Sequence, residues 1–183
     1  MDFRAIFMGF AFAFMWSSAF TSARIIVVDA PPLTALALRF LLSGLISIIL
    51  ARALGQSWHL NRKQWVAVIV FGVCQNGLYL GLNFIAMQSV EASLAAIIAS
   101  TMPLLVALAG WLIFRERVGA LGILGLLAGI GGVGLIMGTR ISMGVDGMGL
   151  LLCGIGVLAL TFATLAVRTV ASGNNVLMVV GLQ

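Results

Sequence analysis

Charged residues are scarce in this sequence. Only 8% of its 183 residues are charged and 62% are hydrophobic, whereas a soluble domain carries about 25% charged residues. This shortage excludes an ordinary soluble protein. The apolar runs have the length of about 20 residues that a membrane-crossing helix needs, and they do not alternate as membrane strands do. The sequence therefore predicts an all-α polytopic membrane protein.

Residues that carry catalysis or bind metals are also few. The two cysteines, Cys74 and Cys153, lie inside apolar runs, form no CxxC pattern and have no histidine near them in sequence. Neither a disulfide nor a zinc site is therefore expected. The single histidine, His59, falls in a predicted loop, and no histidine, lysine or acidic residue inside an apolar run could activate a serine or threonine. We expect no enzyme activity, no cofactor and no metal site.

Six apolar runs are long enough to cross a hydrocarbon core of about 30 Å. They are Ile6–Val28, Pro32–Leu54, Trp65–Met87, Ala92–Phe114, Gly119–Met137 and Met148–Val167. The connections are short, so consecutive helices are predicted to be antiparallel neighbours. A further apolar run from Val176 to Leu182 is too short to cross a bilayer and is interpreted as the start of a seventh helix.

The basic residues predict the orientation. The net charge of +5 is scattered between the apolar runs and is not gathered with aromatic residues, so nucleic-acid binding is not expected. With a cytoplasmic N-terminus, seven basic residues lie inside (Arg4, Arg52, Arg62, Lys63, Arg115, Arg117 and Arg168) and two outside (Arg24 and Arg140). Cytoplasmic loops carry the excess of Lys and Arg. We therefore predict a multi-pass protein of the plasma membrane (the bacterial inner membrane) with its N-terminus in the cytoplasm.

The third run has the richest polar face. Gly72, Asn76, Tyr79 and Asn83 follow one another at i, i+4, i+7 and i+11, which places them in one line along an α-helix, with Gln75 beside it. Amide and phenol groups avoid lipid. This face either lines a cavity or makes hydrogen bonds to neighbouring helices.

The first run carries a second polar stripe. Ser17, Thr21 and Arg24 share one face, and Trp16 lies deep within the run. The stripe either faces protein and water or consists of hydroxyls that bond back to their own helix.

The middle of the fourth run contains Ser100 and Thr101 just before Pro103. A proline in mid-membrane frees backbone carbonyls, which hydroxyls, water or another helix must satisfy. This segment is either a packed helix with a kink or the lining of a polar path.

Arg39 is a charge at membrane depth. It lies seven residues beyond Pro32, about 10 Å along a helix axis. Such a charge costs about 2.5–3.5 kcal/mol on insertion scales, and no acidic residue lies within any apolar run. Arg39 either extends to the outer surface or serves as a packing anchor or substrate contact.

The fifth run is dense in glycine and has no polar side chain. Gly125 with Gly129, and Gly134 with Gly138, form two GxxxG patterns. These patterns predict close packing of helices, with self-association as the alternative.

The sixth run repeats the first weakly. Leu160–Arg168 aligns with Trp16–Arg24 at an offset of 144 residues, which brings Thr161 into the polar stripe. The offset spans an odd number of helices, so the copy would enter the membrane from the opposite side. This pattern is typical of inverted-repeat transporters.

Several short motifs occur together in a characteristic order. They are Trp16-Ser17-Ser18-Ala19-Phe20, Pro32 followed by Arg39-Phe40, Ala95-Ala96, Pro103-Leu104 and Glu116-Arg117. In these motifs the sequence resembles the EamA-like branch of the drug/metabolite transporter superfamily. The resemblance implies a ten-helix transporter of two inverted five-helix repeats. Residues 1–138 would form the first repeat, and residues 147–183 would form helix six and the start of helix seven of an incomplete second.

The resemblance and the polar faces together predict a transporter that exports small metabolites, such as amino acids, by alternating access through a central cavity. We expect the bilayer and a small-molecule substrate as its partners. The predicted substrate-binding residues are Trp16, Ser17, Asn76, Tyr79, Asn83, Ser100, Thr101 and Thr161. The alternative is a truncated or non-transporting membrane subunit, in which a homodimer or a missing C-terminal half completes the cavity.

Overall fold

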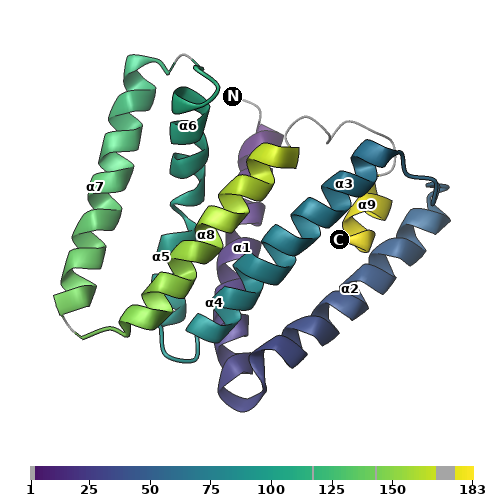
Figure 1. Ribbon diagram of the computed structural model, residues 1–183, viewed down its shortest axis with the longest axis horizontal. Helices are drawn as coiled ribbons and strands as arrows, with labels where there is room; N and C mark the ends of the chain where they lie inside the picture. The colour runs from purple at the N-terminus through teal and green to yellow at the C-terminus, as the bar shows by residue number, and fades with distance from the viewer. Residues whose placement is uncertain (1–2, 117, 143, 168–175) are drawn as a thin grey trace.

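The computed structural model describes residues 3–116, 118–142, 144–167 and 176–183, and within these ranges the chain is helical with no strand. Six helical segments are long and apolar enough to cross a membrane. Both findings confirm the predicted all-α polytopic fold. Its elements are α1 (Phe3–Asp29), α2 (Pro32–Ala53), α3 (Arg62–Phe71), η1 (Gly72–Leu80), α4 (Gly81–Ala86), α5 (Ala92–Ala99), α6 (Met102–Leu112), α7 (Ala120–Ser142), α8 (Gly147–Val167) and α9 (Val176–Leu182) (Figure 1). Arg117, Arg168 and the polar stretch 172–175 lie outside the described residues.

The third span begins earlier than the hydropathy pattern predicts. Asn61 and Gln64 form a capping box: the Asn61 side chain accepts from the Gln64 N–H at 2.8 Å, and the Gln64 side chain accepts from the Asn61 N–H at 2.9 Å. This pair satisfies two backbone donors of the first turn. The helix therefore starts at Arg62, in the basic loop, rather than at Trp65.

The middle of the same span is a π-helix, η1, between the two α-helical pieces α3 and α4. A π-helix bonds residue i to i+5 and so places more residues in each turn than an α-helix. The predicted single line of Gly72, Asn76, Tyr79 and Asn83 is therefore wrong. Asn76 faces α2 and α9, whereas Tyr79 and Asn83 face α1.

The fourth span is broken in its middle. Residues Ser100 and Thr101 separate α5 from α6. Pro103 has no N–H to donate, and its ring excludes the carbonyl four residues earlier. The Ser100 hydroxyl donates to the Ile97 carbonyl at 2.7 Å, and the Thr101 hydroxyl donates to that of Ile98 at 2.6 Å. The two hydroxyls thus bond to the helix end that precedes the proline.

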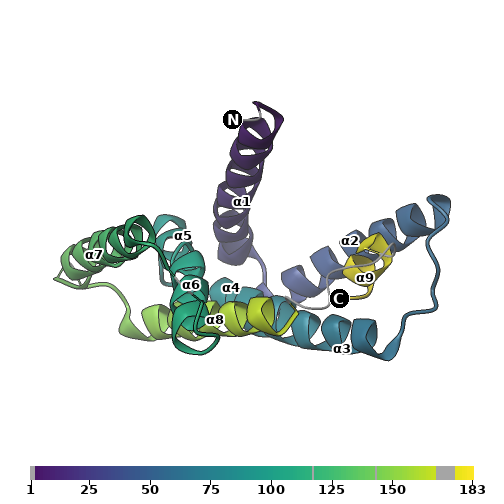
Figure 2. The ribbon, with the colours of Figure 1, turned by 90° about the horizontal axis from the view of Figure 1, so that it is seen from above.

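α8 is the centre of the packing. It lies against η1, α4 and α6, and its Cys153, Val157 and Leu160 are buried in the main apolar cluster (Figure 1). α2 packs instead against α9, at the other side of the molecule. The first half of α1 points away from the layer that contains α3 and α8 (Figure 2), and its aromatic side chains, such as Phe7 and Phe14, are exposed.

Polar contacts tie the helices together at one end, the lower end in Figure 1. The Ser89 hydroxyl donates to the Asp146 carboxylate at 2.6 Å, and Arg140 pairs with Glu91 at 3.2 Å. Asp146 also accepts from the Gly149 N–H at 3.0 Å, at the start of α8. We call these four side chains, Ser89, Glu91, Arg140 and Asp146, the clasp. It joins the α4–α5 loop to the last turn of α7, through Arg140, and to the residue before α8, Asp146.

The glycine-dense helix α7 lies at the edge of the described chain, next to α6 (Figure 1). Of the two GxxxG patterns, only Gly129 approaches another helix, because a Cβ added there would lie 2.9 Å from the Leu104 side chain. Gly125, Gly134 and Gly138 have no such neighbour within 4 Å in the described residues. The predicted close packing therefore holds at one glycine and not along the whole helix.

Candidate functional site

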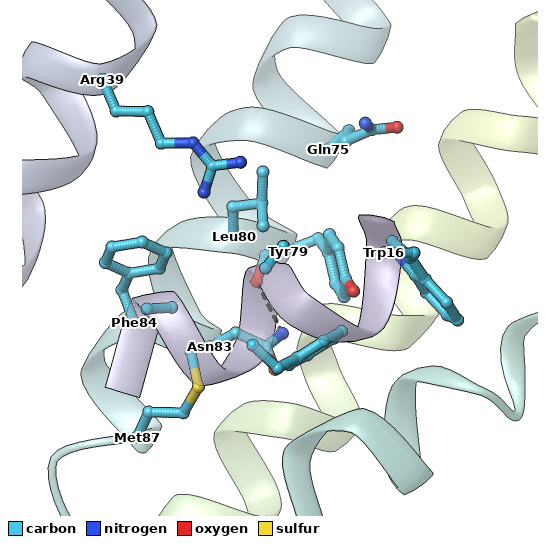
Figure 3. Close-up of a pocket in the computed structure, with 11 residues that line it drawn as sticks. Trp16, Arg39, Gln75, Tyr79, Leu80, Asn83, Phe84 and Met87 are labelled. Atoms are coloured by element: carbon cyan, nitrogen blue, oxygen red, sulfur yellow. Dashed lines mark hydrogen bonds between the residues drawn. The ribbon is translucent and has the colours of Figure 1, made fainter. Parts of the chain in front are cut away.

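A cavity of about 170 Å³ lies where α1, α2, η1 and α4 meet (Figure 3). About 10–15 Å³ of such cavity volume is enough to hold one water molecule, so the cavity has room for a small metabolite. Its lining residues are Trp16, Ala19, Phe20, Ala23, Arg39, Gln75, Tyr79, Leu80, Asn83, Phe84 and Met87. Of the eight residues predicted for a substrate site, the cavity brings together three: Trp16, Tyr79 and Asn83.

Aromatic rings from α1 form one wall. Trp16 and Phe20 are one helical turn apart and meet edge to face, with ring centroids 5.8 Å apart and planes at 80°. Phe12 stacks on the other side of Trp16 at 6.2 Å. This ladder holds the indole in place. It gives the cavity a flat aromatic surface of the kind that binds apolar groups and cations.

Tyr79 and Asn83 supply the polar groups opposite. The two side chains lie one turn apart, with residue exposures of 3% and 2%. The Asn83 Nδ2 donates to the Tyr79 carbonyl at 2.8 Å. The Tyr79 hydroxyl and the Asn83 Oδ1, however, have no hydrogen-bond partner in the described chain. An unsatisfied buried polar group costs about 1–3 kcal/mol, so a hydrogen bond to a ligand or water would stabilise either atom.

Helix α8 packs against Tyr79 and Asn83 at Gly156. A Cβ at Gly156 would lie 3.0 Å from Asn83 Nδ2 and 3.3 Å from the Tyr79 carbonyl oxygen. The glycine lets α8 pack directly on the backbone of η1. The amide of Asn83 is therefore clamped between α8 and its own helix, and its free oxygen has a fixed position.

Arg39 brings a charge from α2. Its side chain reaches towards Leu80 at the same cavity (Figure 3). Within the described residues it has neither an ion pair nor a hydrogen bond. The sequence leaves the role of Arg39 open among surface extension, packing and substrate contact. The structure places it beside the candidate site.

The remaining predicted residues lie elsewhere. Ser17 is exposed and donates to the Phe14 carbonyl at 3.1 Å, and buried Thr161 donates to the Val157 carbonyl at 2.7 Å. Ser100 is exposed, and Thr101 lines apolar surface between α5, α6, α7 and α8. These hydroxyls all bond to carbonyls of their own chain segment, as in the alternative that the first span left open.

Asn76 lines a second cavity of about 170 Å³ between α2, η1 and α9, together with Ser43, Ser47 and Gln183. Gln75 lines both cavities, because it lies on the face of η1 between them. The π-helix thus presents neighbouring amides to two different spaces.

The predicted site residues do not include the apolar walls of the cavity, and they do not include Gln75 or Arg39. Phe20 lies one turn after Trp16, and Phe84 follows Asn83 directly, so helical spacing could have indicated the first. The contribution of α2 had no such signal, since it depends on how that helix packs against η1 and α4. No three metal-binding side chains come together in the residues described.

Arg24 of α1 binds the end of α4 beside the cavity. Its guanidinium donates to the carbonyl of Met87, which lines the cavity at the end of α4. Two arginines therefore flank the region, but Arg24 is occupied by backbone and Arg39 is not.

Comparison with known proteins identifies the family. Residues 3–138 match the EamA-like transporter family. The chain is 28% identical to an uncharacterized transporter of Synechocystis over 67% of its length and 37% of the relative's. It is 25% identical to the uncharacterized transporter YvbV of Bacillus subtilis over 92% of its length and 55% of the relative's.

A third relative is the S-adenosylmethionine/S-adenosylhomocysteine transporter of Chlamydia muridarum, at 31% identity over 62% of this chain and 36% of the relative. The chain thus spans about half, or less, of the length of the curated relatives it matches. No solved structure matches it significantly.

Proposed function

Because the chain belongs to the EamA-like transporter family, we propose that it acts in the export of small metabolites by alternating access, with amino acids as the first candidates. The protein is a multi-pass membrane protein. We place it in the bacterial inner membrane with a cytoplasmic N-terminus, as the basic residues predict. Membership of a family of transporters also fits our expectation that it is not an enzyme.

The observation that carries this proposal is the pair of unpartnered buried atoms, the Tyr79 hydroxyl and Asn83 Oδ1, at a cavity walled by aromatic rings. A phenol can donate or accept, and an amide oxygen accepts. A substrate with an N–H or O–H donor and an apolar part satisfies both the orphaned oxygen and the rings. An amino acid has both features.

The clasp supports an alternating-access mechanism. Its contacts are an exposed hydrogen bond and an exposed ion pair, which can be exchanged for contacts with water. With the N-terminus inside, the end of the molecule with the clasp faces outward. Release of substrate to the outside would then require the clasp to open.

We propose that further protein completes the cavity, either a C-terminal half or a second copy of the chain. The support is the length of the relatives, of which this chain spans about half or less. The division into a first repeat over 1–138 and an incomplete second repeat over 147–183 remains a prediction from the resemblance of the sequence motifs.

The test is export of radiolabelled compounds from cells that express the protein from its own gene. The panel contains aromatic and aliphatic amino acids, with S-adenosylmethionine included because of the chlamydial relative. Tyr79→Phe removes one hydroxyl from the site and is expected to reduce flux by about 3–10-fold, the value of one hydrogen bond.

Ser17→Ala is the matched control, because that hydroxyl is exposed and bonds to its own helix outside the cavity. Its flux should equal that of the wild type at equal expression. Equal flux in Tyr79→Phe and wild type would remove Tyr79 from the site. Export of no member of the panel would refute the proposed substrates.

A further inference from the structure

Arg39 is the one charged side chain among the described residues that line the Trp16–Tyr79–Asn83 cavity. Figure 3 shows its guanidinium reaching from α2 towards the residues of η1 and α4. It lies about 10 Å inside the helix that begins at Pro32. A guanidinium at this depth requires a partner or water.

The described chain offers that guanidinium no anion. Glu91 pairs with Arg140 at the clasp, and Arg39 makes no ion pair or hydrogen bond within the described residues. Arg24 differs from Arg39 in this respect, because its guanidinium donates to the Met87 carbonyl. A planar guanidinium with five donors matches a carboxylate or phosphate particularly well.

The same cavity also contains a hydrogen-bond acceptor that lacks a donor. Asn83 Oδ1 is a buried acceptor without a donor, and Phe20 and Phe84 provide apolar walls. A ligand that satisfies the whole cavity therefore carries an anionic oxygen group, an N–H or O–H donor and an apolar part. Neutral solutes and simple cations leave Arg39 unpaired.

We propose that Arg39 is the specificity-determining anion site of this cavity and that the transported substrate is a small amphipathic carboxylate. The carboxylate pairs with Arg39 while the donor group bonds Asn83 Oδ1. This inference rests on the proposed function, because it takes the cavity to be the substrate site. It adds the residue that recognises the anionic group of the substrate.

The first experiment needs no transport. In a background with Cys74→Ser and Cys153→Ala, Gln75→Cys places a thiol at the cavity wall. Its rates of reaction with the anionic sulfonatoethyl and the cationic trimethylammonioethyl methanethiosulfonates are compared in maltoside micelles. The anion-to-cation rate ratio is expected to fall at least about tenfold when Arg39→Gln is added, because a nearby positive charge concentrates anions.

Arg52→Gln is the matched control, since Arg52 is an exposed arginine of the same helix that does not line the cavity. It should leave the ratio unchanged. An unchanged ratio in Arg39→Gln would overturn the proposal. Loss of the wild-type anion preference on adding phosphatidylglycerol would also overturn it, because the guanidinium would then be binding a lipid phosphate.

The second experiment measures competition by amino acids and by their uncharged amides in membrane vesicles. Amides should compete at least about tenfold more weakly than amino acids in the wild type, and this discrimination should vanish in Arg39→Gln and persist in Arg39→Lys. Equal competition by amides in the wild type would overturn the carboxylate assignment. A normal thiol-rate result with no amino acid transported would instead keep the anion site and refute amino acids as substrates.

Discussion

Substitution of Gly156 by alanine tests whether α8 really packs on the backbone of the candidate site. The new methyl group would lie 3.0 Å from Asn83 Nδ2 and 3.3 Å from the Tyr79 carbonyl oxygen. The Nδ2 cannot swing away freely, because it donates to that same carbonyl at 2.8 Å. Either the hydrogen bond breaks or α8 moves away from η1.

The expected magnitude follows from two opposing effects. Overpacking of a well-packed site costs about 1–3 kcal/mol, whereas replacing a helical glycine by alanine gains about 1 kcal/mol from helix propensity. Gly154→Ala separates the two effects, since Gly154 lies on the same helix and has no neighbour within 4 Å of an added Cβ. Gly156→Ala should therefore be less stable than Gly154→Ala by about 1–3 kcal/mol.

The assay is SDS titration of the protein in dodecyl maltoside micelles, with the free energy of unfolding as the readout. Transport measured beside it should fall in Gly156→Ala, because Asn83 is displaced, and remain normal in Gly154→Ala. Equal stability of the two variants would refute the close contact between α8 and η1. The clamped position of the Asn83 amide would then also be wrong.

Two further predictions concern the clasp. The hydrogen bond from Ser89 and, to a smaller extent, the backbone N–H groups at the start of α8 lower the pKa of Asp146 in the folded protein. The ionised Asp146 carboxylate therefore stabilises the fold at pH values above the ordinary aspartate range. This stabilisation is lost as the pH falls through the folded pKa. Thermal unfolding should therefore show Asp146→Asn to be less stable than wild type at neutral pH, and the two should converge in acid; a difference that does not change with pH would contradict this reasoning. Gly149→Ala would place a methyl group against Val90 of the α4–α5 loop and should lower the free energy of unfolding by about 1–3 kcal/mol. Gly147→Ala is the control, because an added Cβ there meets nothing within 4 Å. Equal free energies of unfolding in the two variants would refute the contact.

The membrane fold could be predicted from the sequence because hydropathy is a local property. A run of about 20 apolar residues must satisfy its backbone as a helix in lipid, whatever its neighbours do. The six spans are therefore confirmed within a few residues. The match of residues 3–138 to the family confirms the resemblance. It could be recognised from the sequence because its short motifs, such as Trp16–Phe20 and Pro103-Leu104, are also local features.

The composition of the candidate site could be predicted only in part. Tyr79 and Asn83 were identified because polar groups in a span avoid lipid, and Trp16 because of its depth. Ser17, Ser100, Thr101 and Thr161 are equally polar in sequence, but a hydroxyl can bond to a carbonyl of its own helix and then needs no cavity. The structure shows that bond for all four.

The sequence by itself determined the membrane environment, the number of spans and the family. Tertiary structure decided which polar residues share a space. The π-helical turn of η1 separates Asn76 from Tyr79, although α-helical spacing aligns them. The packing of α2 brings Arg39 to Asn83 across 44 residues of sequence. The physical reason is that helix formation depends on local hydropathy, whereas a cavity depends on the register and packing of several helices at once.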